Sequence, residues 1–80
     1  MAQGKRISTE IDATALQTIK ELGAAAKAAR LNAAEGQSTA AAKLGVHVQT
    51  IARIESGEPG VSAGHLFGLL ALYGLTAQVR

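Results

Sequence analysis

Apolar residues recur at helical intervals in the first long stretch of this chain, which begins after Asp12. Aspartate is a favourable N-cap residue, and Ile11 before it can pack against Leu16 one turn into the helix. We therefore predict a helix from Asp12 to about Leu31. Gly23 marks a point where this helix can break, because glycine weakens helix interiors. The inward face of the helix consists of Leu16, Ile19, Leu22, Ala26 and Ala29.

Two shorter helices follow, separated by a glycine. We predict that they span Gln37–Leu44 and His47–Ser56. Gly45 can adopt the positive φ that the turn between them requires, and the small side chain of Ala41 permits a close crossing. This arrangement is that of a helix-turn-helix, with the motif over residues 37–56. The apolar seam shared by the two helices consists of Ala40, Leu44, Val46, Ile51 and Ile54.

The last part of the chain predicts a fourth helix and a strand. Ser62 is a suitable N-cap for a helix to about Tyr73, and apolar residues surround much of the axis of this helix. One small core does not need so much apolar surface, which indicates a partner surface. Residues 75–80 alternate between apolar and polar, with the period of a half-buried strand. Because the chain contains no second predicted strand, we expect this segment to pair with its copy in a second subunit.

Residues 1–10 lack apolar periodicity, and we interpret them as a mobile arm. The predicted organisation is therefore this arm, a helical domain over residues 11–74 and a dimerisation strand over residues 75–80. Of the 80 residues, 48% are apolar, with one Phe, one Tyr and no Trp. This composition is typical of packed helices, so we predict an all-α fold. Its core is thin at this length, and dimerisation is expected to add stability.

Charge, cysteine content and the length of apolar stretches reduce the number of function classes open to this chain. The chain has no cysteine, which excludes disulfides, thiolate metal sites and cysteine nucleophiles. The net charge of +2 is a weak bias toward polyanions such as nucleic acids. The longest apolar stretch, residues 61–75, is too short and too interrupted to span a bilayer, and residues 1–9 lack the apolar region of a signal peptide. We therefore expect a soluble, cytoplasmic protein with no membrane contact.

One face of the third predicted helix carries side chains suited to DNA. When the seam residues point inward, helical geometry turns a polar face outward, as in a recognition helix that enters the major groove. Gln49 can pair with adenine through two hydrogen bonds, Arg53 can reach guanine or a phosphate, and Val48 can cover a thymine methyl group. Gln37 and Ser38, at the start of the preceding helix, can hold a phosphate. The outward face consists of His47, Val48, Gln49, Ala52 and Arg53.

Several of these residues also have plainer interpretations. His47 either contacts phosphate or is a solvated side chain at a helix start, and Lys43 is either a solvated charge or a phosphate contact. Thr50 and Ser38 can each cap a helix, bind phosphate, or do both. Neither hydroxyl has the neighbouring His and carboxylate that nucleophilic catalysis requires, and the two histidines lack metal-ligand spacing. We therefore expect no enzymatic activity, no metal and no cofactor.

The segment QSTAAAKLGVHVQTIARIESG, residues 37–57, resembles the phage-repressor or xenobiotic-response-element (Cro-type) family of helix-turn-helix regulators. The resemblance implies a compact lambda-repressor-like domain of four to five helices. It also implies a buried ion pair between Arg30, seven residues before Gln37, and Glu55. Ala34, Glu35 and Gly36 stand where the family has a Gly-hydrophobic-Ser/Thr run, and Ala40 stands where it prefers leucine.

Residues 57–80 look like the C-terminal part of the HipB-like subgroup, in which a final strand pairs across the dimer. Two functions follow from the residues and the resemblance. The first is an autoregulatory repressor, a homodimer that binds a near-palindromic duplex operator at the nucleoid with its third helices in major grooves. The alternative is an antitoxin or bridging module whose main partner is a protein, such as a HipA-like kinase toxin.

Overall fold

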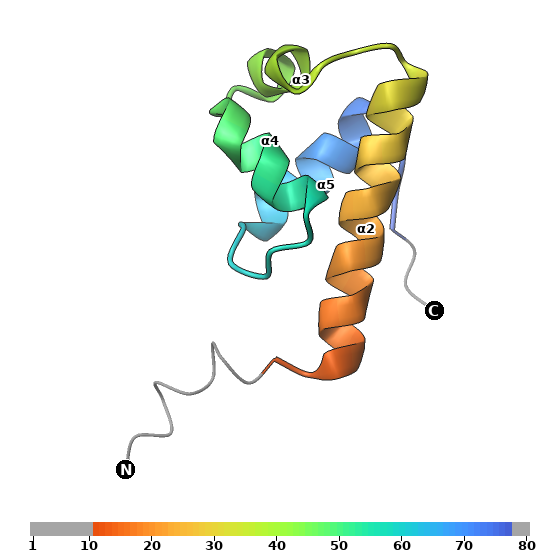
Figure 1. Cartoon of the computed structure of the whole chain (residues 1–80), viewed down its shortest axis with the longest axis vertical. Helices are drawn as coiled ribbons and strands as arrows, with labels where there is room; N and C mark the ends of the chain where they lie inside the picture. The colour runs from red at the N-terminus through yellow and green to blue at the C-terminus, as the bar shows by residue number, and fades with distance from the viewer. Residues whose placement is uncertain (1–10, 78–80) are drawn as a thin grey trace.

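The computed structural model describes residues 11–77, and these residues form four α-helices (Figure 1). The predicted all-α class is confirmed, and each helix lies within about two residues of its predicted range. Residues 11–77 contain neither a fifth helix nor a strand. The helices are α2 (Ala13–Asn32), α3 (Gln37–Leu44), α4 (Val48–Glu55) and α5 (Ala63–Leu72).

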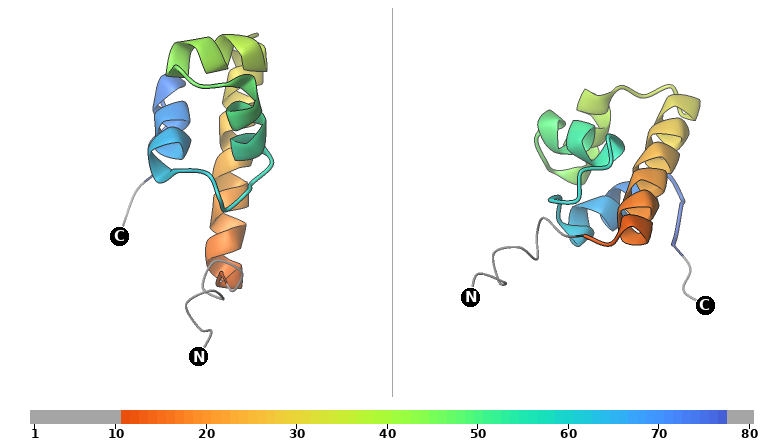
Figure 2. Two further views of the ribbon diagram at one scale, coloured as in Figure 1. Left: turned by 90° about the vertical axis from the view of Figure 1, so that its left-hand side faces the viewer. Right: turned by 60° about the horizontal axis from the view of Figure 1, so that its bottom comes forward.

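Helix α2 is the longest and forms one side of the molecule. As predicted, the Asp12 carboxylate caps it, accepting hydrogen bonds from the backbone N–H groups of Thr14 at 2.9 Å and Ala15 at 3.2 Å. These bonds satisfy two of the N–H groups that a helix start leaves without an intrahelical partner. The N-terminal part of α2 extends beyond the other three helices (Figures 1 and 2). The prediction that Leu16 and Ile19 face inward is therefore wrong: both are only half-buried, and neither belongs to the core.

Gly23 does not break α2, although glycine weakens helix interiors and a break was possible here. The helix is continuous through it, and Gly23 is buried. A Cβ atom at this position would overlap the backbone carbonyl oxygen of Ile54, near the end of α4. Gly23 therefore serves the close approach of α2 and α4, which the sequence pattern alone does not reveal.

The turn between α3 and α4 has the predicted form. Gly45 has a φ of 79°, and its N–H donates to the carbonyl oxygen of Ala41 at 2.8 Å. Of the predicted seam, Ala40, Ile51 and Ile54 are buried, and the other two residues are half-buried against them. Helix α3 crosses over one end of α4 and α5, which lie side by side below it (Figure 2, left). The core consists of Ala26, Ala40, Ala41, Ile51, Ile54, Leu66, Leu69 and Leu70.

Helix α5 begins and ends as its sequence predicts. The Ser62 hydroxyl caps it by accepting the N–H of His65 at 3.0 Å, and Gly74 follows its end with a φ of 76°. Leu75 then packs against the core, while residues 75–77 are not in a strand. Residues 78–80 and the predicted arm, residues 1–10, lie outside the described range. The strand across a dimer therefore stays a prediction, since its partner would belong to a second subunit.

None of the helices within residues 11–77 combines the length and apolar character needed to cross a membrane.

Candidate nucleic-acid interface

Helix α4 divides into a buried and an exposed face. Its buried residues are Ile51, Ile54 and Glu55, and Val48 in its first turn is 43% exposed. His47 precedes the helix with an extended backbone and provides no side-chain cap. The side chains that the sequence predicts for the outward face all lie in solvent-exposed positions, namely those of His47, Val48, Gln49, Ala52 and Arg53.

Thr50 and Ser38 lie at the edges of this face. Thr50 is half-buried, and its backbone N–H donates to the carbonyl oxygen of His47 at 2.9 Å, closing the first turn of α4. Ser38 is exposed in the first turn of α3, which follows Gly36 and has no side-chain cap. N–H groups in an uncapped first turn can bind an anion. The candidate interface thus combines exposed side chains on α4 with the uncapped first turn of α3.

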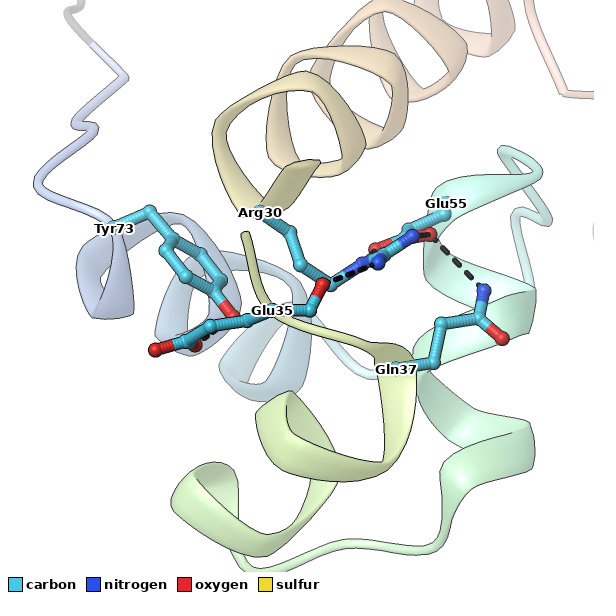
Figure 3. Close-up of polar contacts among 5 residues, drawn as sticks. All are labelled: Arg30, Glu35, Gln37, Glu55 and Tyr73. Carbon is cyan, nitrogen blue, oxygen red and sulfur yellow. Dashed lines mark hydrogen bonds and ion pairs between the residues drawn. The ribbon is translucent and has the colours of Figure 1, made fainter. Parts of the chain in front are cut away.

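A buried ion pair lies behind the interface. Arg30 on α2 donates from Nε to Glu55 Oε2 at 2.7 Å and from Nη2 to Oε1 at 3.0 Å (Figure 3). The two side chains are 6% and 3% exposed. Arg30 also donates from Nη1 to the backbone carbonyl oxygen of Glu35 at 2.7 Å. One guanidinium therefore joins α2, the end of α4 and the connector before α3, so it sets the position of both motif helices.

The surroundings keep both members of this pair charged. Burial by itself raises the pKa of the Glu55 carboxyl, but hydrogen bonds from Arg30 and Gln37, with the positive charge of Arg30, lower that pKa below its ordinary value. The hydrogen bond to Glu55 raises the pKa of Arg30 despite the opposing effect of burial. Bidentate hydrogen bonding offsets the cost of removing two charges from water.

Gln37 has a structural contact in addition to its predicted role. It is half-buried at the start of α3, and its Nε2 donates to Glu55 Oε1 at 3.1 Å (Figure 3). The buried ion pair therefore orients the amide group that the sequence predicts as a phosphate contact. Such orientation lowers the conformational entropy that Gln37 would lose on binding a ligand.

Glu35 and Tyr73 form a second polar cluster that sequence reasoning missed. The Tyr73 hydroxyl donates to Glu35 Oε1 at 2.9 Å (Figure 3). Lys43 forms an ion pair with Glu35 Oε2. Hydrogen bonds from Lys43 and then Tyr73 lower the pKa of Glu35, while burial and Glu35 raise the pKa of Tyr73. In the sequence, the one feature that could have pointed to this cluster was that Glu35 departs from the family pattern. The cluster engages Lys43, which the sequence assigned either to solvent or to phosphate.

Arg53, the other basic residue of the predicted interface, is also paired. Its Nε donates to Glu58 Oε1 at 2.9 Å, and the two side chains are 53% and 49% exposed. The guanidinium lies close to Gly60 in the turn after α4. Arg53 is thus directed toward the C-terminal end of α4, away from the N-terminal residues that reach base edges in recognition helices.

Comparison with known proteins agrees with this geometry. A family model described as helix-turn-helix matches residues 37–79, which is more than half of the chain. The match begins at the first residue of α3 and includes α4 and α5. No curated protein and no solved structure matches the chain.

Proposed function

The chain belongs to the helix-turn-helix family of the xenobiotic-response-element type, and we propose that it is a sequence-specific DNA-binding transcriptional regulator. The observation that carries the proposal is the division of α4: Ile51 and Ile54 are buried, while Gln49 is exposed on the opposite face and Val48 is exposed in the first turn. A helix anchored on one side can insert its other side into a major groove about 12 Å wide.

The proposed contacts follow from position along α4. Gln49, near the N-terminal end, forms two hydrogen bonds with adenine, Val48 covers a thymine methyl group, and His47 lies beside them. Arg53, farther along, is directed toward the DNA backbone. The remaining contacts, with phosphates, come from Gln37, Ser38, Lys43 and Thr50.

A dimer is the proposed working form, acting in the cytoplasm at the nucleoid. Two copies of α4 would enter major grooves one helical turn apart, about 34 Å, on a near-palindromic operator. Phe67 on α5 is 44% exposed and Leu31 at the end of α2 is 57% exposed. A second copy of the chain could cover such side chains, and the predicted strand over residues 75–80 would pair with its copy. Binding upstream of its own gene would make the protein an autoregulatory repressor.

Fluorescence anisotropy tests this function. The purified chain is titrated into a duplex from just upstream of its own gene and into a scrambled duplex, at several salt concentrations. We expect selective, salt-sensitive binding, because phosphate contacts release counterions. Gln49→Ala should weaken binding to the upstream duplex by roughly 10- to 100-fold, the value of one bidentate base contact. Gln17→Ala on the exposed part of α2 is the matched control. Equal, salt-independent binding to both duplexes contradicts the proposal.

A protein partner is the second candidate function. The exposed Phe67 side chain favours it, because an aromatic ring at the surface is a common anchor for another protein. In this role the chain would be an antitoxin or bridging module that binds a protein such as a kinase toxin. Mixing the chain with a kinase encoded beside its gene tests the idea by size-exclusion chromatography. A complex that Phe67→Ser abolishes supports it, and the absence of a complex contradicts it.

A further inference from the structure

The backbone at the end of α4 brings residue 58 back to residue 53. Gly57 has a φ of 81°, its N–H donates to the Ile54 carbonyl oxygen at 3.0 Å, and the N–H of Glu58 donates to the Arg53 carbonyl oxygen at 3.1 Å. These two bonds form a Schellman motif, the common left-handed helix end. Because the motif fixes the backbone of residue 58 beside that of residue 53, the Glu58 carboxylate meets the Arg53 guanidinium without ordering a long loop.

Acidic side chains balance the basic ones over residues 11–77, including the basic residues of the proposed interface. Residues 11–77 carry equal numbers of basic and acidic side chains. The residues outside this range include three basic ones and one acidic one, namely Lys5, Arg6, Arg80 and Glu10. Both basic residues assigned to DNA are paired with a carboxylate, Lys43 with Glu35 and Arg53 with Glu58. Phosphate binding at Arg53 must therefore compete with a carboxylate already in place.

We propose that Glu58 sets the affinity of the interface for duplex DNA, irrespective of base sequence, by holding the Arg53 guanidinium in competition with phosphate. The inference rests on the proposed DNA-binding function. Carboxylate and phosphate oxygens are alternative partners for the same guanidinium, which bonds both in the same geometry. The Arg53–Glu58 pair is about half exposed, so it is weak enough for phosphate to displace, yet its carboxylate stays beside the approaching DNA.

Glu58 is a better candidate for this role than Glu35. The Glu35 side chain accepts from Tyr73 as well as from Lys43, so replacing it would also disturb the contact between α5 and the connector. Within residues 11–77, the Glu58 carboxylate bonds to one side chain, that of Arg53, and its own side chain is 49% exposed. Its charge can therefore be removed with little effect on the fold.

The test is a double-mutant cycle with the full chain. Wild type, Glu58→Gln, Arg53→Ala and the double variant are titrated by anisotropy into the upstream duplex and into a random-sequence duplex of about 30 base pairs, long enough for two adjacent major grooves. Glu21→Gln on α2, with the same change of net charge, is the matched control; Glu21 is exposed and accepts from Gln17. Thermal unfolding of each variant checks that the fold is retained.

We expect Glu58→Gln to raise the affinity for both duplexes by about three- to tenfold and to steepen the salt dependence by about one phosphate contact. The gain should disappear in the Arg53→Ala background and be absent in Glu21→Gln. An unchanged affinity, an equal gain with and without Arg53, or a loss confined to the upstream duplex would overturn the role of Glu58. Failure of wild type and all variants to bind either duplex at low salt would instead contradict DNA binding itself.

Discussion

The carboxylate of Glu55, the last residue of α4, holds the guanidinium of Arg30 on α2 through hydrogen bonds of 2.7 and 3.0 Å. The same carboxylate accepts from Gln37 at the start of α3, so one buried group touches all three helices that position the interface. Within residues 11–77 no buried side-chain nitrogen or oxygen lacks a hydrogen-bond partner. The stability of the motif therefore depends strongly on this pair, because removing one member leaves a buried charge unpaired.

Replacing Glu55 with alanine should lower the free energy of unfolding by about 3–5 kcal/mol, the typical loss when one partner of a buried ion pair is removed. Urea denaturation followed by circular dichroism measures the change. Glu21→Ala, which removes an exposed carboxylate on α2, is the control and should change stability by less than about 1 kcal/mol. If Glu55→Ala unfolds no earlier than the wild type, the pair does not stabilise the fold.

Stability should also depend on pH through Glu55. Its pKa is lower in the folded chain than the ordinary value near 4.5, so the unfolded state binds its proton first as the pH falls. The stabilisation from Glu55 is fully present above about pH 4.5 and is lost as the pH falls through the folded-state pKa. Urea midpoints measured between neutral and acidic pH should therefore decline below about 4.5, and Glu55→Gln should flatten this decline. A slope that Glu55→Gln leaves unchanged would assign the effect to other carboxylates.

Replacing Gly23 with alanine should destabilise the fold, although alanine is the better helix former. The added Cβ meets the Ile54 carbonyl oxygen, which belongs to backbone and cannot easily move, so we expect a loss of about 1–3 kcal/mol. Gly64→Ala in α5 is the matched control: its Cβ would lie 3.9 Å from the Ser62 hydroxyl, and a gain of about 0.5–1 kcal/mol is expected. Thermal unfolding of both variants separates crowding from helix propensity. Equal gains in both would show that α2 and α4 are not in close contact at Gly23.

Ala34, in the connector between α2 and α3, has a φ of 59°, a conformation that costs an L-residue roughly 1–2 kcal/mol. Ala34→Gly should relieve this strain and stabilise the chain by about 0.5–1 kcal/mol after the greater flexibility of glycine in the unfolded state is subtracted. The neighbouring Ala33 has a φ of −82°, so Ala33→Gly should instead destabilise by a similar amount. The two substitutions are compared by their urea midpoints, and opposite signs are the expected result. A loss of stability in Ala34→Gly would contradict the strain.

Local patterns in the sequence determined the helices and their ends. Asp12 and Ser62 cap helices, and Gly45 has the left-handed conformation expected of it, because caps and turns depend on neighbours within a few residues. Helical periodicity likewise placed Ile51 inside and Gln49 outside. The family resemblance, rather than any local pattern, pointed to Arg30 and Glu55 as partners.

Tertiary structure alone decided how the helices meet and which charges pair. The close approach at Gly23, the amide contact of Gln37 with Glu55 and the hydrogen bond from Tyr73 to Glu35 each join segments far apart in the chain. Such contacts depend on where one helix crosses another, and a shift of a few ångströms would separate the same side chains. Periodicity shows which side of a helix is buried, but it does not show what that side touches.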